Sequence, residues 1–187
     1  MDSSALKSRP FTIAENSTIN GVLFPAGSIV GLDERGGLWR CHISEETLIG
    51  GVPCMADSEV EFHPNGTLAA CRPAHNFYAG HIAVSGGSLT LFHENGALFR
   101  CIPAADTNIG GIYAKSGTEL CLFDDGSVSS FETAGSFPSG SLPSGSFPAG
   151  FPVKPGTRVW LHPGGRLKAA TDHETGHILR FAGECHD

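Results

Sequence analysis

Hydrophobic and polar residues alternate along short stretches of this chain, and turn residues separate successive stretches. Residues 59–63 and 67–72 alternate on either side of Asn65-Gly66. Asn-Gly between two alternating stretches favours a β-hairpin because both residues tolerate positive φ. The same layout recurs around four other glycines: Gly36, Gly96, Gly126 and Gly164. The pattern therefore predicts five β-hairpins.

The hairpins recur with a fixed period, since Gly36, Gly66 and Gly96 are evenly spaced and a cysteine follows each of them after five positions. The fifth copy comes later, because the interval from Gly126 to Gly165 is longer than the preceding ones. A fixed period of this kind is typical of stacked repeat architectures. We expect an all-β fold of tandem 30-residue β-hairpin repeats that form an extended or curved antiparallel sheet.

One repeat domain is predicted over residues 1–187, with the five hairpin repeats at about 17–170. Residues 136–150 interrupt the period with a Ser-apolar-Pro-small-Gly motif, whose prolines oppose a helix and whose glycines favour turns. This insertion is either a slack connection or a lid. Residues 171–187 are predicted to form a capping half-repeat, because Ile178 stands in register with equivalent isoleucines. These are Ile19, Ile49 and Ile109.

Alternation also assigns the two faces of the predicted sheet, since residues two apart share a face. One face is apolar in every copy, as in Val30, Val60 and Val159, and is predicted to be the core. The other face is mixed. Its apolar members are the predicted ligand- or partner-binding residues: Trp39, Leu89, Leu91, Phe99 and Trp160. Connecting segments, a second subunit or a ligand could each cover this face.

Composition excludes several functions. The chain carries 12 Lys and Arg against 19 Asp and Glu, a formal net charge of −7, which is unsuited to binding nucleic acid. No apolar stretch is long enough for a membrane span. The first residues lack a basic region followed by an apolar one, so we expect a soluble, cytoplasmic protein.

Cysteine spacing favours burial over disulfide formation. Cys41, Cys71 and Cys101 occupy equivalent repeat positions. Equivalent residues two strands apart are separated by roughly 10 Å, whereas a disulfide needs Cα atoms within about 7 Å. We predict that these three cysteines are small buried hydrophobic residues.

A histidine ladder is the main candidate for catalysis. His63, His93 and His162 share one repeat position, where Asp33 stands in the first copy. Neighbouring ladder residues are too far apart to share a zinc ion, whose ligands lie about 2.0–2.1 Å from the metal. If the array curves, the histidines could line a cleft as general acids and bases with Asp33 and Glu94.

One further motif, His173-Glu174-Thr175-Gly176-His177, matches the His-Glu-x-x-His pattern of zinc proteases. That chemistry needs a helix, which Gly176 and the hairpin register both oppose. We predict no metal site and no cofactor.

The repeat resembles the bacterial β-hairpin repeat proteins related to MORN repeats, with a longer period. The resemblance implies an extended antiparallel sheet that binds partners or membranes. It is carried by Phe62–Leu68, Phe92–Leu98 and Leu122–Val128, together with Gly27-Ser28, Gly117-Thr118 and Gly156-Thr157.

We therefore predict a non-catalytic binding or scaffold module that docks a protein partner or a second copy of itself. The alternative is a small-molecule enzyme, an isomerase, cyclase or hydrolase, that uses His and carboxylate acid-base chemistry in a cleft covered by the insertion at 136–150.

Overall fold

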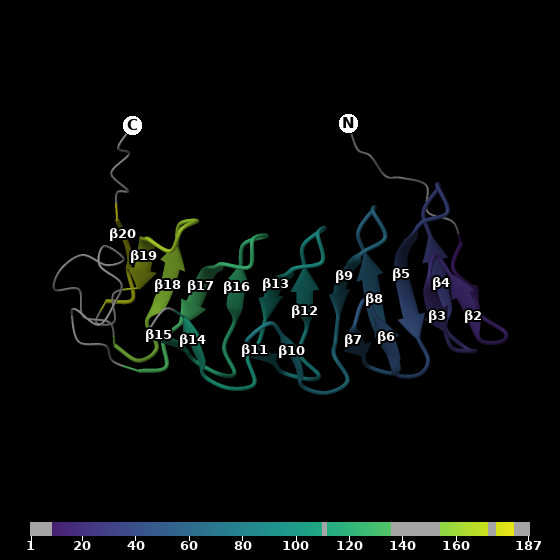
Figure 1. The fold of residues 1–187 in the computed structure, drawn as a ribbon, viewed down its shortest axis with the longest axis horizontal. Helices are drawn as coiled ribbons and strands as arrows, with labels where there is room; N and C mark the ends of the chain where they lie inside the picture. Colours follow the sequence, from purple (N-terminus) through teal and green to yellow (C-terminus); the bar gives the residue numbers. More distant parts are fainter. Residues whose placement is uncertain (1–8, 110–111, 136–153, 172–174, 182–187) are drawn as a thin grey trace. The chain divides into compact units, whose positions relative to one another are not determined.

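The fold is that of a computed structural model, which describes residues 9–109, 112–135, 154–171 and 175–181. Throughout these residues the regular secondary structure consists of β-strands, so the all-β prediction is confirmed (Figure 1). The insertion at 136–150 and the first two residues of the His-Glu-x-x-His motif, His173 and Glu174, lie outside the described residues.

The chain forms two compact units, Met1–Phe77 with Ser85–Leu98 and Tyr78–Val84 with Phe99–Asp187. The long strands of each unit pair antiparallel with their neighbours. In the first unit their order is β1 (Phe11–Thr12), β4 (Ile29–Leu32), β5 (Leu38–Ile43), β8 (Ser58–Phe62), β9 (Leu68–Cys71) and β12 (Thr90–Phe92). In the second it is β13 (Leu98–Cys101), β16 (Leu120–Leu122), β17 (Val128–Glu132), β18 (Arg158–Leu161), β19 (Leu167–Thr171) and β20 (Ile178–Arg180).

The long strands meet in hairpins whose turns repeat one geometry. The Gly66 N–H donates to the His63 carbonyl, and the His63 N–H donates to the Thr67 carbonyl. A register shift between Glu61 and Phe62 precedes this turn, which is the mark of a β-bulge. Gly66 has a φ of 85°, a conformation that favours glycine and explains its recurrence once in every repeat.

Among the described residues, four smaller hairpins of two three-residue strands each lie between the long ones in the sequence (Figure 1). In the first of them, both central residues of the tight turn have positive φ, Asn20 (48°) and Gly21 (82°). The small hairpins are β2 (Ser17–Ile19) with β3 (Val22–Phe24), β6 (Thr47–Ile49) with β7 (Val52–Cys54), β10 (Phe77–Ala79) with β11 (Ile82–Val84), and β14 (Thr107–Ile109) with β15 (Ile112–Ala114). The sequence predicted the long hairpins alone.

The core lies between the long strands and the small hairpins. Val60 of β8 and Cys54 of β7 are both fully buried, and Cys54 forms a β-bridge with Pro73 after β9. The predicted apolar face is confirmed, because Val30 and Val159 are also fully buried. Cys41, Cys71 and Cys101 are buried as predicted.

Both ends of the series of long strands are short. β1 pairs with β4 through only Phe11 and Thr12, and β20 pairs with β19 through three residues. Short edge strands limit pairing with other chains. Ile178, which the sequence analysis aligned with Ile19, Ile49 and Ile109, lies in β20 and pairs with Thr171 of β19.

Candidate functional site

The histidine ladder lies at the turns of the long hairpins, and its first member contacts the backbone. Nε2 of His63 lies 2.9 Å from the carbonyl oxygen of Phe92, on the following hairpin. The side chains of Asn65 and Thr67 likewise donate to the backbone carbonyl of Glu94, at 2.7 and 3.0 Å. These contacts join consecutive hairpins, so His63 is positioned to stabilise the repeat. The Glu94 carboxylate takes no part in them and is exposed.

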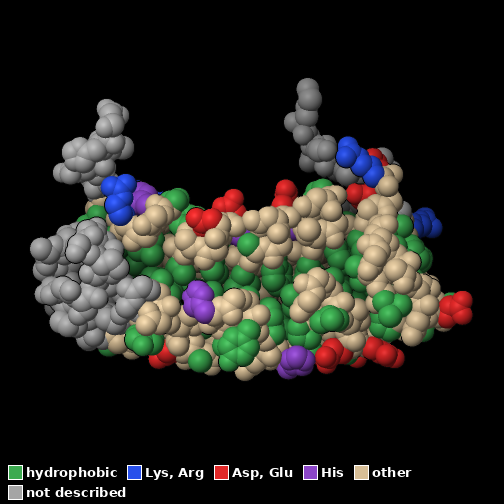
Figure 2. All heavy atoms as spheres, in the orientation of Figure 1, with side chains coloured by type: hydrophobic (Ala, Val, Ile, Leu, Met, Phe, Trp, Pro, Cys, Tyr) green, Lys and Arg blue, Asp and Glu red, His purple; other side chains and the backbone are tan. Residues whose placement is uncertain are grey.

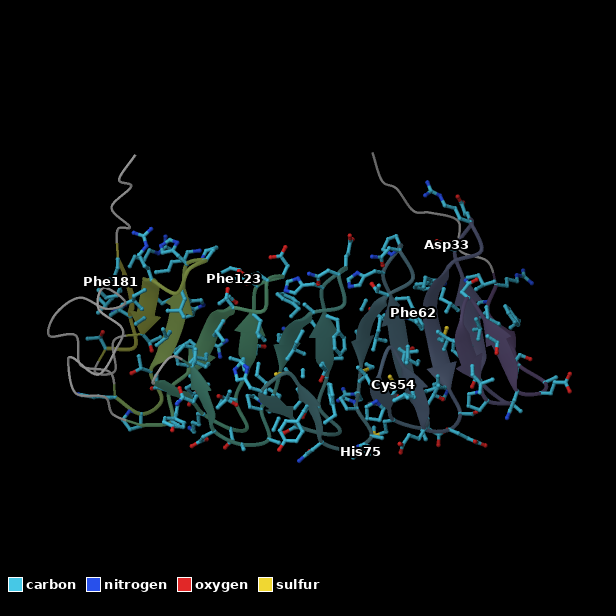
Figure 3. The ribbon with its side chains drawn as sticks, viewed as in Figure 1. Asp33, Cys54, Phe62, His75, Phe123 and Phe181 are labelled. Carbon is cyan, nitrogen blue, oxygen red and sulfur yellow. The ribbon has the colours of Figure 1, made fainter. Side chains whose placement is uncertain are left out.

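The other predicted catalytic residues occupy the same kind of turn. The carboxylate of Asp33 accepts hydrogen bonds from the N–H groups of Arg35 and Gly37 at 2.9 and 2.8 Å, and therefore closes its own turn. His93 and His162 are half-buried, and the backbone carbonyl of each accepts the N–H of the glycine three residues on. Figure 3 shows Asp33 at the turn end of the long strands.

Within either unit, the predicted partner-binding residues lie on two strands that are not neighbours, with Leu89 and Leu91 together at β12. In the first unit, β8 and β9 separate Trp39 on β5 from Leu91 on β12, a span of about 14 Å across three strand spacings. Leu89, just before β12, is exposed. In the second, β16 and β17 separate Phe99 on β13 from Trp160 on β18.

Ion pairs lie on the same strands as these apolar residues and reach to the neighbouring strands. Arg158 donates to the carboxylate of Glu119 at 3.1 Å and to Ser130 Oγ at 3.1 Å. Arg100 lies 3.3 Å from the same carboxylate. In the first unit, Arg40 of β5 pairs with Glu61 of β8. The mixed face therefore carries ion pairs among its apolar residues.

A different set of exposed apolar residues lies on the small hairpins. In a three-residue strand the middle side chain points away from its two neighbours. Thr47 and Ile49 of β6 are buried, while Leu48 between them is 70% exposed. Leu23 of β3 is 58% exposed in the same unit. In the second unit, the middle residues Tyr78 of β10 and Tyr113 of β15 are 78% and 46% exposed.

The two exposed leucines flank a hollow of about 250 Å³ in the first unit, where β3 and β6 contact one another. Two carboxylate side chains, Glu45 and Glu46, line the hollow with Leu23 and Leu48. In Figure 2, apolar and acidic side chains lie next to one another along the lower edge of the part that holds β2 to β7. This surface, the small-hairpin face of the first unit, is the candidate site.

Sequence reasoning missed this face, although a signal was present. Tyr78 follows Leu48 by one repeat period, so the two share one repeat position. Tyr113 follows Leu23 by three periods, so these two share another. Large apolar residues at a repeat position that the core does not use would have indicated an exposed stripe.

Among the described residues, no group of three or more His, Cys, Asp or Glu side chains is arranged to hold a metal ion. The same residues contain no helix long and apolar enough to cross a membrane. No family model, curated protein or solved structure matches the chain.

Proposed function

We propose that this protein is a non-catalytic binding module, which docks a protein partner on the outward face of its small hairpins. The observation that carries the proposal is the exposure of Leu48, at 70%, beside Leu23, at 58%, around one hollow. Burying an exposed leucine contributes about 1.5–3 kcal/mol, so a partner that covers both gains substantial free energy.

The second unit supports the same use of the small hairpins. Tyr78 and Tyr113 project from middle positions there, with 78% and 46% of their surface exposed. Tyrosine is enriched in protein interfaces because its ring adds apolar area and its hydroxyl can hydrogen-bond at the rim. A repeated element that presents apolar residues suits repeated contacts with an extended partner.

The contacts of the histidine ladder support the alternative, a small-molecule enzyme, less well than the small hairpins support a binding module. General acid-base catalysis needs a side chain within hydrogen-bond reach of a substrate proton. His63 instead lies against the Phe92 carbonyl, and Asp33 accepts two N–H groups of its own turn. Both side chains therefore already form structural contacts, His63 with the following hairpin and Asp33 within its own turn.

The test is to capture partners from source-cell lysate with the immobilised protein and two double variants. Leu48→Ser with Tyr78→Ser changes the small hairpins, while Leu89→Ser with Phe99→Ser changes the long strands. All four side chains are at least 40% exposed, so both variants should fold. We expect the first variant to lose a protein that the wild type and the second variant retain. Loss from the second variant alone would place the interface on the long strands, against the proposal.

A further inference from the structure

We propose that the hollow on the small-hairpin face of the first unit receives an arginine or lysine side chain from the protein partner. This inference rests on the proposed function and adds the chemistry of the partner. The occupant is a segment with one basic side chain between apolar ones.

The walls of the hollow suit the stem of a long basic side chain. Leu23 and Leu48 flank it, and its volume is about 250 Å³. Arginine and lysine bury their methylene groups against apolar surface while the charged end stays near water or a carboxylate. A leucine or phenylalanine would fit between the same walls but would bring no positive charge to Glu45 and Glu46.

Charge complementarity selects a basic partner over a second copy of this chain. The ionisable side chains that line the hollow are Glu45 and Glu46, both acidic. Among the described residues Glu45 takes part in no ion pair, and Glu46 lies 3.6 Å from His75 Nε2, with both side chains more than half exposed. Two copies would each bring a formal net charge of −7, and like charges oppose association.

Glu46 also differs from the residues at the same position of the other repeats, which form a structural hydrogen bond. Asn16, Asn76 and Asp106 stand at equivalent positions, and each accepts the N–H of the residue ten positions later, at 2.8–2.9 Å. Glu46 forms no such bond to Ala56 within the described part of the chain. Its longer side chain therefore lines the hollow instead of closing the base of its hairpin.

The experiment is an amide NMR titration of the full chain with two peptides. The first is acetyl-Leu-Ser-Arg-Ser-Leu-amide, which places leucine, arginine and leucine on one side when extended, since side chains alternate along a strand. The second carries citrulline, which has nearly the shape of arginine without its charge. The protein variants are Glu45→Gln with Glu46→Gln and, as a matched control, Glu94→Gln, whose carboxylate is exposed at a long-hairpin turn.

We expect the arginine peptide to shift the amides of Leu23 and residues 45–48, with an affinity at least fivefold higher than that of the citrulline peptide. The double variant should lose this preference and Glu94→Gln should keep it. Equal affinity for both peptides would overturn the basic-side-chain inference while leaving the docking face intact. Failure of both peptides to shift residues 45–48 would also overturn it. The capture experiment judges the proposed function separately.

Discussion

At the scale of single residues, two repeats place one large and one small side chain at the same pair of buried positions. In the first repeat the small-hairpin position holds Phe24 and the long-strand position holds Cys41, both at most 1% exposed. In the fourth repeat the order is reversed, with Ala114 and Phe131. The second repeat holds a smaller pair there, Cys54 and Cys71. A close-packed core resists a large side chain at both positions at once.

A swap in the fourth repeat tests this complementarity. Ala114→Phe alone should overpack the core and lower the free energy of unfolding by about 1–3 kcal/mol. Phe131→Cys alone should lower it by about 3 kcal/mol by leaving a cavity. The double variant should lose clearly less than the sum, since it restores the arrangement of Phe24 and Cys41. Urea denaturation of the four proteins measures this coupling, and strict additivity would contradict it.

The buried thiols should be unreactive in the folded protein. Burial raises the pKa of Cys41 to about 11 and is the main cause that raises the pKa of Cys101 to about 12. The thiolate is the reactive form, so at pH 8 alkylation of Cys41 should be about 100-fold slower than in the unfolded chain.

The same shift predicts a loss of stability in alkaline solution. The unfolded thiols ionise first as pH rises above 9, so the stability they contribute is present below that pH and is lost towards pH 11.

Iodoacetamide labelling with mass spectrometry, with and without urea, measures how far folding protects the thiols from alkylation. Equal labelling of Cys41 in both conditions would show that this position is open.

At the scale of elements, the sequence predicted the long hairpins and missed the small ones. The alternation of five-residue strands such as β8 is long enough to show a period of two, and Asn65-Gly66 marks the turn. Strands β6 and β7 have three residues each, which is too short to show alternation, so the turn sequence Ile49-Gly50-Gly51-Val52 resembles part of one apolar stretch. Alternation assigned the core face correctly, but it could not reveal a second layer of hairpins that covers this face.

The histidine ladder illustrates the same limit. Its period was visible, but the Phe92 carbonyl that His63 contacts belongs to the next hairpin, and such a contact depends on how two hairpins stack. The sequence therefore identifies the repeat position of His63 but not the contact that its side chain makes.

Substitution of His63 separates the structural role from a catalytic one. His63→Ala removes the group that faces the Phe92 carbonyl, and should cost about 1 kcal/mol of unfolding free energy. His63→Gln keeps a donor of similar reach and should recover at least half of that loss. Thermal unfolding of the three proteins measures the difference. Equal stability of all three would remove the structural role and return His63 to the list of catalytic candidates.

At the scale of the whole molecule, the fixed repeat period makes the chain modular. Neighbouring hairpins contact mainly one another, as the pairing of β5 with β8 and of β8 with β9 shows. In stacked repeats, stability is close to a sum of the repeats and their nearest-neighbour interfaces.

Removal of one full period should therefore leave a folded protein. Deletion of residues 45–74 joins Ser44 to His75 and keeps every later residue at its repeat position. We expect a cooperative unfolding transition and a β-sheet circular dichroism spectrum at reduced stability. A shorter deletion, of residues 45–69, does not match the period and should abolish cooperative unfolding, because it removes β8 and cuts β9, its partner strand, in half. If both deletions behave alike, the period does not set the packing.

The account depends most on which face of the protein a partner covers. Hydroxyl-radical footprinting of the full chain, with and without the partner recovered by capture, measures this directly, since leucine and aromatic side chains are both oxidised. The account predicts protection of Leu23, Leu48 and Tyr78, with unchanged oxidation of Trp39, Phe99 and Trp160. Protection of Trp39, Phe99 or Trp160, with Leu23 and Leu48 still fully reactive, would contradict it.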